Sequence, residues 1–220
     1  MSTESTIKIL ITDDHAVVRQ GLKQILKDEF PEAEFGEAAS GNEALDKARE
    51  TDWNVIIMDI SMAGRNGLEI LKQLRVEEIK TPVLMLSMHP EDQYAVRVLK
   101  AGAHGYLTKE SASDELVLAT RRLLEGRKYI SISLAEKLAN DLEKDLNKPV
   151  QELISDREYQ VLCLIASGKT VSQIAGELSL SVPTISTYRS RILQKMNFKN
   201  NAQLTHFALE QGLISVVSPE

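Results

Sequence analysis

The first 125 residues alternate between short apolar runs and longer segments whose apolar residues recur every three or four positions. The runs are residues 7–11, 33–37, 55–58, 83–86 and 105–107. The longer segments are residues 15–28, 40–50, 66–75, 91–102 and 111–126. Because the runs are too short for helices and several are rich in Ile and Val, they indicate strands. The alternation predicts an α/β fold, a doubly wound, five-stranded parallel sheet with helices on both faces.

Polar residues stand where the predicted strands end. Asp13 and Asp14 follow the first run, Asp59 follows the third, Ser87 follows the fourth and Lys109 comes shortly after the fifth. Ligands of such sheets gather outside the carboxyl ends of the strands, so we expect these side chains to meet at one edge.

Two adjacent carboxylates repel each other unless they are solvated or share a cation. One interpretation is a solvated pair at a helix N-terminus, where negative charge is favoured. With Asp59 and Lys109 at the same edge, a shared cation is the better interpretation. Three carboxylates form a hard oxygen site suited to Mg²⁺.

The rest of the chain contains only helix patterns. Residues 126–150 combine an amphipathic segment with a polar stretch ending at Pro149, which predicts a helical connector and linker. The sequence SDRE at 155–158 is a capping box, and Gly168 would end the helix that it starts. Further helix patterns at 171–178, 182–196 and 200–212 complete a small all-α domain of four helices.

Composition restricts the class of protein. The N-terminus lacks a basic segment followed by a long apolar core, and no apolar run reaches the roughly 20 residues of a membrane span. The single cysteine, Cys163, lies among apolar neighbours and is expected in a core, which fits a cytoplasmic protein. The net charge of −6 is uneven, with −7 over residues 1–125 and 0 over 151–220. The two regions are therefore expected to have different tasks.

With TDDH at 12–15, MDI at 58–60, Ser87, Tyr106 and Lys109 in strand order, the first 125 residues resemble the receiver domain of two-component response regulators. The resemblance implies that Asp59 accepts a phosphoryl group from the phosphohistidine of a sensor kinase. The implied Mg²⁺ ligands are Asp13, Asp14, Asp59 and the backbone carbonyl of Ser61.

The same resemblance implies that Lys109 and Ser87 stabilise the phosphoryl oxygens, and that Ser87 and Tyr106 form the conformational switch. These roles agree with the chemistry, since phosphoryl transfer needs an in-line nucleophile and cations near the equatorial oxygens. An aspartyl-phosphate phosphohydrolase is a weaker alternative. Such enzymes carry a second acid two residues after the nucleophile, whereas Asp59 is followed by Ile60 and Ser61.

The C-terminal seventy residues resemble the LuxR-type helix-turn-helix of the NarL/FixJ family, through the stretch from SDREYQVLCLIASG to ISTYRSRILQKM and on through NNAQLTHFALEQGLI. The motif itself would span about 171–190 within a domain of residues 151–220. Ala175 would let the two motif helices cross closely, and Ile185 would anchor the second helix to the core.

A helical wheel of residues 182–196 separates two faces. Ile185, Ile192, Leu193 and Met196 share one apolar arc and are expected to face the core. The opposite face, predicted to enter a major groove, carries Pro183, Ser186, Thr187, Ser190, Arg191 and Gln194. The predicted phosphate contacts are Ser181, Thr184, Tyr188 and Lys195.

Together these patterns predict a cytoplasmic transcription regulator, not an enzyme, whose phosphorylation controls DNA binding. The expected partners are a sensor histidine kinase, double-stranded DNA and a second copy of the chain, with RNA polymerase as a further candidate and no membrane. The alternative is a phosphorylation-controlled adaptor whose helical tail binds protein or RNA. His15 is expected to be a partly exposed residue at a helix start, with contact to a carboxylate as the less favoured interpretation.

Overall fold

The structure is a computed structural model that describes residues 6–88, 91–131, 134–136, 154–211 and 213–214. Two compact units are formed. One runs to residue 132 apart from residues 92–96, and the other contains residues 92–96 and 133 onward. Within the described residues, no helix is long and apolar enough to cross a membrane.

Five strands form one parallel sheet in the order β2-β1-β3-β4-β5. They are β1 (Lys8–Thr12), β2 (Glu34–Ala38), β3 (Val55–Asp59), β4 (Val83–Ser87) and β5 (Gly105–Thr108). The predicted sheet is confirmed, although each strand ends one residue later than its apolar run. The reason is that the next residue still pairs with a neighbouring strand, as Thr12 does with Met58 and Asp59 with Leu86.

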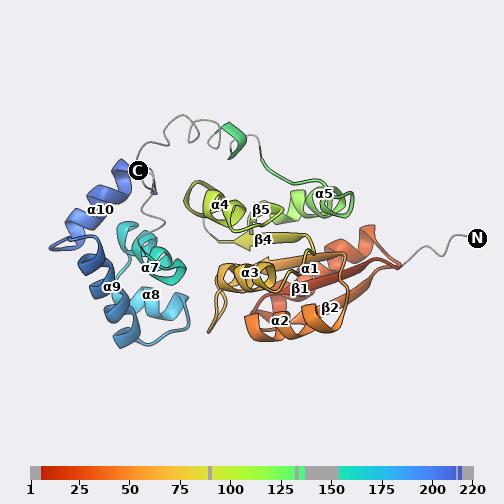
Figure 1. The fold of residues 1–220 in the computed structure, drawn as a ribbon, viewed down its shortest axis with the longest axis horizontal. Coiled ribbons are helices and arrows are strands. Elements are labelled where there is room, and N and C mark those ends of the chain that lie inside the picture. Colours follow the sequence, from red (N-terminus) through yellow and green to blue (C-terminus); the bar gives the residue numbers. More distant parts are fainter. Residues whose placement is uncertain (1–5, 89–90, 132–133, 137–153, 212, 215–220) are drawn as a thin grey trace, which may run out of the picture. The chain divides into compact units, whose positions relative to one another are not determined.

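Helices cover both faces of this sheet (Figure 1). They are α1 (Ala16–Glu29), α2 (Gly41–Glu50), α3 (Gly67–Val76), α4 (Glu91–Lys100) and α5 (Ala112–Leu124). Helices α1 and α5 pack together and share a core with alternate strand residues such as Ile9, Ile57 and Leu86. The intervening residues, such as Leu10 and Met85, are buried on the opposite face, since successive side chains of a strand alternate between faces.

The strand order reverses between β1 and β3, which are neighbours in the sheet. In open α/β sheets, ligands bind beside the carboxyl ends of the strands at such a reversal. The fold therefore provides a binding position beside Asp13 and Asp59.

The chain returns to the edge strand after α5. The backbone N–H of Tyr129 donates to the carbonyl of His104 at 2.8 Å, and Tyr129 forms an isolated parallel bridge with Gly105. The Tyr129 hydroxyl also hydrogen-bonds Glu115 on α5. The ordered α/β unit thus continues beyond residue 125. The amphipathic helix predicted for the connector lies mostly outside the described residues, of which 134–136 are helical.

The second unit contains α7 (Asp156–Ala166), α8 (Val171–Glu177), α9 (Val182–Lys195) and α10 (Asn201–Glu210), as predicted. The capping box is confirmed, because the Ser155 hydroxyl accepts from the Glu158 N–H at 3.2 Å and the Ser155 N–H donates to the Glu158 carboxylate at 2.8 Å. Gly168 lies just beyond α7 with φ of 85°, a backbone conformation that favours glycine. Cys163 is buried, as expected.

Candidate functional site

The acidic residues meet at the carboxyl end of the sheet. Asp13 directly follows β1, and its fully buried carboxylate accepts a hydrogen bond from Lys109 Nζ at 2.7 Å. The same ammonium group lies 3.0 Å from Oδ2 of Asp59, the last residue of β3. Lys109 is placed by its own backbone N–H, which donates to the Ser87 carbonyl at 2.7 Å. One cation therefore joins two buried carboxylates from neighbouring strands.

Asp14 links the loops that follow β1 and β3. Its Oδ2 accepts a hydrogen bond from the backbone N–H of Ala63 at 2.9 Å. His15 Nδ1 lies 2.8 Å from Asp14 Oδ1 and 3.2 Å from Asp13 Oδ1, while 68% of the His15 side chain stays exposed. Both interpretations of His15 therefore hold, since this exposed residue at the start of α1 also contacts the acidic pair.

Burial and charge set the ionisation of the site. Burial raises the pKa of Asp59 to about 6, while the nearby Lys109 ammonium opposes the rise and Asp13 adds to it. Burial alone would lower the pKa of Lys109, but the Asp59 and Asp13 carboxylates outweigh this and the pKa lies above its usual value. Lys109 is therefore charged at neutral pH, and its charge is shared by two acids.

The donor set fits a hard divalent cation. Both oxygens of Asp59, and Oδ1 of Asp14, are buried and lack hydrogen-bond donors apart from the ion pairs with Lys109 and His15. Buried carboxylate oxygens in this condition need a cation. Asp13, Asp14 and His15 bring ligand atoms within 4.8 Å of one another. Because Mg²⁺ prefers oxygen ligands, the carboxylates rather than the imidazole are the fitting donors.

Ser87 and Tyr106 occupy one face of neighbouring strands. Ser87 ends β4 and Tyr106 lies in β5, and both are fully buried. Leu86 and Leu107 belong to the core shared with α1 and α5, so alternation places Ser87 and Tyr106 on the opposite face. Ser61 lies two residues after Asp59, and its backbone N–H is close enough to the Asp59 carboxylate to lower the pKa of Asp59 slightly.

Gly67 was not predicted as a site residue. A Cβ atom at this position would lie 2.1 Å from the carbonyl oxygen of Asp59, so only glycine lets α3 start so close to the end of β3. The Gly67 N–H donates to the Ile60 carbonyl at 3.0 Å, and Asn66 caps the helix by accepting from the Glu69 N–H at 2.8 Å. The signal in the sequence is an Asn-Gly pair just before an apolar helix pattern.

Arg19 was also not predicted. This residue lies on α1, and its Nη1 donates to the backbone carbonyl of Asp13 at 2.6 Å. No feature of the sequence separates Arg19 from the other basic residues of α1, because the contact depends on how α1 packs beside the end of β1.

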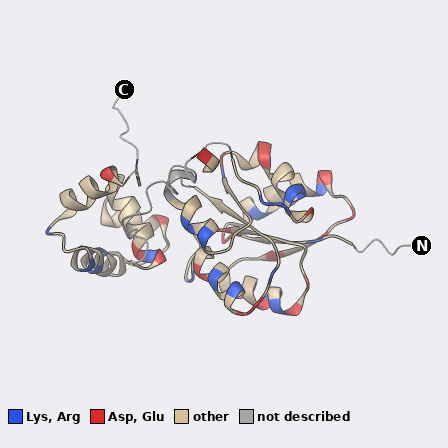
Figure 2. Cartoon of the chain, turned by 45° about the horizontal axis from the view of Figure 1, so that its top comes forward, with Lys and Arg blue, Asp and Glu red and all other residues tan. Residues whose placement is uncertain are grey.

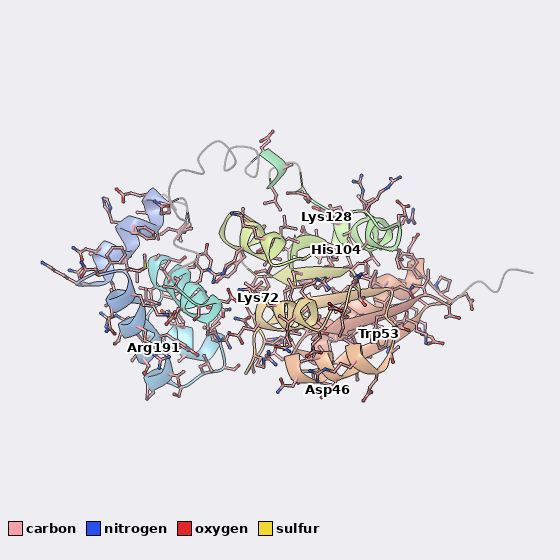
Figure 3. All side chains as sticks on the ribbon, viewed as in Figure 1. Asp46, Trp53, Lys72, His104, Lys128 and Arg191 are labelled. Carbon is pink, nitrogen blue, oxygen red and sulfur yellow. The ribbon has the colours of Figure 1, made fainter. Side chains whose placement is uncertain are left out.

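Helix α9 presents the predicted groove-facing residues to solvent. Those residues are Pro183, Ser186, Thr187, Ser190, Arg191 and Gln194, and all are exposed. Figure 3 labels Arg191 on this helix. On the other side Ile185 and Ile192 are fully buried, as predicted. Leu193 and Met196 are only half-buried, because they lie at the margin of the apolar arc.

Several residues proposed as phosphate contacts already have partners within the unit. Ser181 caps α9 by accepting from the Thr184 N–H at 3.2 Å, and the two hydroxyls lie 2.7 Å apart. Lys195 Nζ pairs with Glu158 Oε2 at 2.6 Å, and Tyr188 is half-buried. Arg189 donates to the Asn201 side chain at 2.6 Å and so links α9 to α10.

Charged residues are dense on the helices around the sheet and sparse on the C-terminal helices (Figure 2). A surface with few charges would read DNA mainly through short polar side chains.

Two family models match the chain, one over the α/β unit and one over the helical unit that follows it. The response regulator receiver domain matches residues 9–121, and the luxR family of bacterial regulatory proteins matches residues 152–208. The chain belongs to the LuxR-type response regulators. This family consists of DNA-binding transcription regulators of two-component systems, which argues against the phosphohydrolase alternative.

Relatives of this response regulator span nearly its whole length. It is 35% identical to the response regulator UvrY of Escherichia coli K12 over 94% of this chain and 95% of UvrY. It is 33% identical to the response regulator GacA of Pseudomonas aeruginosa over 96% of this chain and all of GacA.

Solved structures support the same fold. A LuxR-family response regulator from Aurantimonas matches with 33% identity and a TM-score of 0.58, over 63% of this chain and 99% of that one. RcsB of Salmonella enterica serovar Typhimurium, solved bound to the rprA promoter with the phosphomimetic BeF₃⁻, matches with 24% identity and a TM-score of 0.59. That match covers 92% of this chain and 98% of RcsB.

Proposed function

We propose that this response regulator accepts a phosphoryl group on Asp59 from the phosphohistidine of a sensor histidine kinase, and that phosphorylation controls DNA binding by α9. The observation that carries the proposal is the Asp59 carboxylate. It is buried at the end of β3, short of hydrogen-bond donors and 3.0 Å from Lys109.

The residues around Asp59 would have different roles in phosphoryl transfer. An ionised Asp59 oxygen attacks the phosphorus, and the oxygen–phosphorus bond forms as the bond to the histidine nitrogen breaks. Lys109, whose Nζ lies 3.0 Å from Asp59, would pair with the incoming phosphoryl oxygens, a role that positioned cations fill in such reactions. Asp13, Asp14, Asp59 and the Ser61 carbonyl would hold Mg²⁺, which neutralises charge on the phosphoryl group.

The response to phosphorylation would run through β4 and β5. The Ser87 hydroxyl would hydrogen-bond the phosphoryl group, and Tyr106 on the same sheet face would change rotamer. Phosphorylation then stabilises one of two pre-existing conformers, and the face of β4 and β5 differs between them.

The DNA-binding part of the proposal concerns α9. Ser186, Thr187, Ser190, Arg191 and Gln194 would reach base edges, and the protein would bind two half-sites as a homodimer. RcsB supplies the precedent, because it has been solved bound to promoter DNA and as two dimers bound to two parallel DNAs. RNA polymerase would be a further partner at activated promoters.

We assign residues 1–125 to the receiver domain, 126–150 to the connector and linker, whose first residues pack back on the receiver sheet at Tyr129, and 151–220 to the DNA-binding domain. We place the protein in the cytoplasm, where the kinase domain and the DNA are both accessible.

Labelling with a small phosphodonor tests the central claim. Acetyl phosphate should label the protein only when Mg²⁺ is present, and Asp59→Asn should abolish the label because the nucleophilic oxygen is lost. Phosphorylated wild-type protein should then retard genomic DNA fragments in a gel. Undiminished labelling of Asp59→Asn would contradict the proposed phosphoacceptor, and retardation of RNA alone would favour the adaptor alternative.

A further inference from the structure

We propose that Arg19 is a positioning residue for the acidic pair, which holds the backbone at Asp13 so that the Asp13 and Asp14 carboxylates are aimed at a divalent cation. The inference rests on the proposed function, because it concerns the same cation site. It adds a residue of α1 that the roles assigned above do not include.

The contact reaches the main chain of the site directly. Arg19 Nη1 donates to the Asp13 carbonyl oxygen at 2.6 Å, and the Arg19 N–H donates to the His15 carbonyl at 3.1 Å. The Arg19 side chain is only 14% exposed. A short hydrogen bond from a mostly shielded guanidinium to a carbonyl restricts the peptide between Asp13 and Asp14. Because this peptide connects both acids, its orientation sets where their carboxylates point.

Arg19 is itself anchored to the neighbouring strand. Its Nε lies 3.5 Å from Oε2 of Glu37, a residue of β2 that also pairs with Lys23 at 2.7 Å. Lys23 lowers the pKa of Glu37, with Arg19 contributing, so Glu37 is ionised at neutral pH. The Asp13 N–H donates to the Ala38 carbonyl at 3.2 Å. Asp13 is therefore tied to β2 twice, directly through its N–H and through Arg19 at its carbonyl.

The geometry suits arginine in particular. The guanidinium is a planar fork that can face two acceptors at once, here donating to the Asp13 carbonyl and forming an ion pair with Glu37 at 3.5 Å. The Asp13 carboxylate is already occupied, because it accepts from Lys109 at 2.7 Å and from the His15 N–H at 2.8 Å. The carbonyl is the remaining acceptor of this residue, and Arg19 supplies its donor.

Positioning and simple charge predict opposite effects of removing Arg19. A positive charge close to a cation site repels the cation, so its loss would tighten Mg²⁺ binding if Arg19 acted only as a charge. If Arg19 positions the carboxylates, its loss should weaken Mg²⁺ binding, since residues that orient metal ligands typically affect affinity by 10- to 100-fold.

The test measures binding of Mg²⁺ alone to the full-length protein by calorimetry. Arg19→Met should raise the dissociation constant about tenfold. The matched control is Lys23→Met, which removes an equal charge from Glu37 without touching Asp13 and should bind Mg²⁺ within about twofold of wild type. In acetyl phosphate labelling, Arg19→Met should need more Mg²⁺ for half-maximal rate and approach the wild-type plateau at saturating Mg²⁺.

Each outcome decides between the two proposals. If wild type and Lys23→Met bind no Mg²⁺, the proposed function fails. If both bind Mg²⁺ while Arg19→Met binds it as tightly as wild type or more tightly, only the role of Arg19 fails. Should Arg19→Met not fold, Arg19→Lys takes its place, because it keeps the charge and loses the fork. Wild-type affinity of that variant would overturn the inference.

Discussion

The acidic edge of the sheet and the exposed face of α9 are built in opposite ways. Asp13 and Asp59 are almost fully buried, come from different strands and share one lysine. The α9 face is exposed, comes from a single helix and contains one arginine among short polar residues. The electrostatic free energy of the first site therefore depends on a few coupled charges. The free energy of DNA binding by the second site is expected to be spread over many weak contacts.

This difference determines how each region should respond to change. In the buried site one substitution alters the environment of every other charge, so effects should be non-additive and dependent on pH. On the exposed face, single substitutions should act almost independently, and salt should be the strongest external variable.

The largest expected effect is that of salt on DNA binding. The cations near α9 are Arg189, Arg191, Lys195 and Lys199. If about three of them per protomer reach phosphates, a dimer makes about six contacts and should lose roughly 10³-fold in affinity between about 50 and 200 mM salt. The half-sites should lie about 10 base pairs apart, or a multiple of that. The measurement is a salt titration of binding by anisotropy, together with a footprint.

The control for the salt experiment is Lys128→Met, which removes an exposed cation of the α/β unit and should leave the slope unchanged. A slope equal to one or two contacts, with a single unpaired footprint, would show that the protein binds as a monomer.

The next largest effect concerns the stability of the buried site. Burial raises the pKa of Asp59 from 3.8 to about 6. The folded chain thus holds the proton more tightly than the unfolded chain, and stability falls as pH rises through this interval. In the absence of Mg²⁺, Asp59→Asn should raise the free energy of unfolding at pH 7 by about 1–3 kcal/mol.

Urea unfolding at several pH values measures this gain. It should shrink as pH falls from about 6 toward 4, because the wild-type carboxyl then becomes neutral as well. Saturating Mg²⁺ should stabilise wild type more than Asp59→Asn. A gain in stability that is the same at pH 7 and pH 4.5 would mean that the charge of Asp59 is not the cause.

A smaller effect is expected for base recognition. Thr187→Ala and Ser190→Ala should each change the preference at one or two base positions by about tenfold, while total affinity for non-specific DNA stays the same. Selection of bound fragments from a random library measures the preference. If both variants select the wild-type sequence, the exposed face of α9 does not read bases.

The smallest effect is expected for Lys195→Ala. Because Lys195 is partly exposed and already paired with Glu158, its removal should cost about 0.5 kcal/mol in stability and weaken binding to all DNA sequences slightly and equally. Thermal unfolding and binding to two unrelated fragments check both parts. Lys199→Ala is the control for loss of an exposed charge, and a Lys195→Ala effect specific to one DNA sequence would contradict this expectation.

The fold was largely predictable from local pattern. Short apolar runs located the strands and apolar spacing of three or four residues located the helices, while Ser155 with Glu158 located a cap, because these signals depend on neighbours within a few residues. Strand ends were placed one residue early, since pairing by Thr12 or Asp59 depends on the adjacent strand and not on hydrophobicity.

The sequence by itself determined which polar residues follow the apolar runs, and therefore which side chains end the strands. It also determined the apolar and polar faces of α9, because the period of a helix follows from backbone geometry. Only the tertiary structure decided that Lys109 lies between Asp13 and Asp59, that Gly67 contacts the Asp59 carbonyl and that Arg19 reaches the Asp13 carbonyl. These contacts join segments separated in the chain, and their distances depend on how helices pack on the sheet. No local pattern encodes that packing.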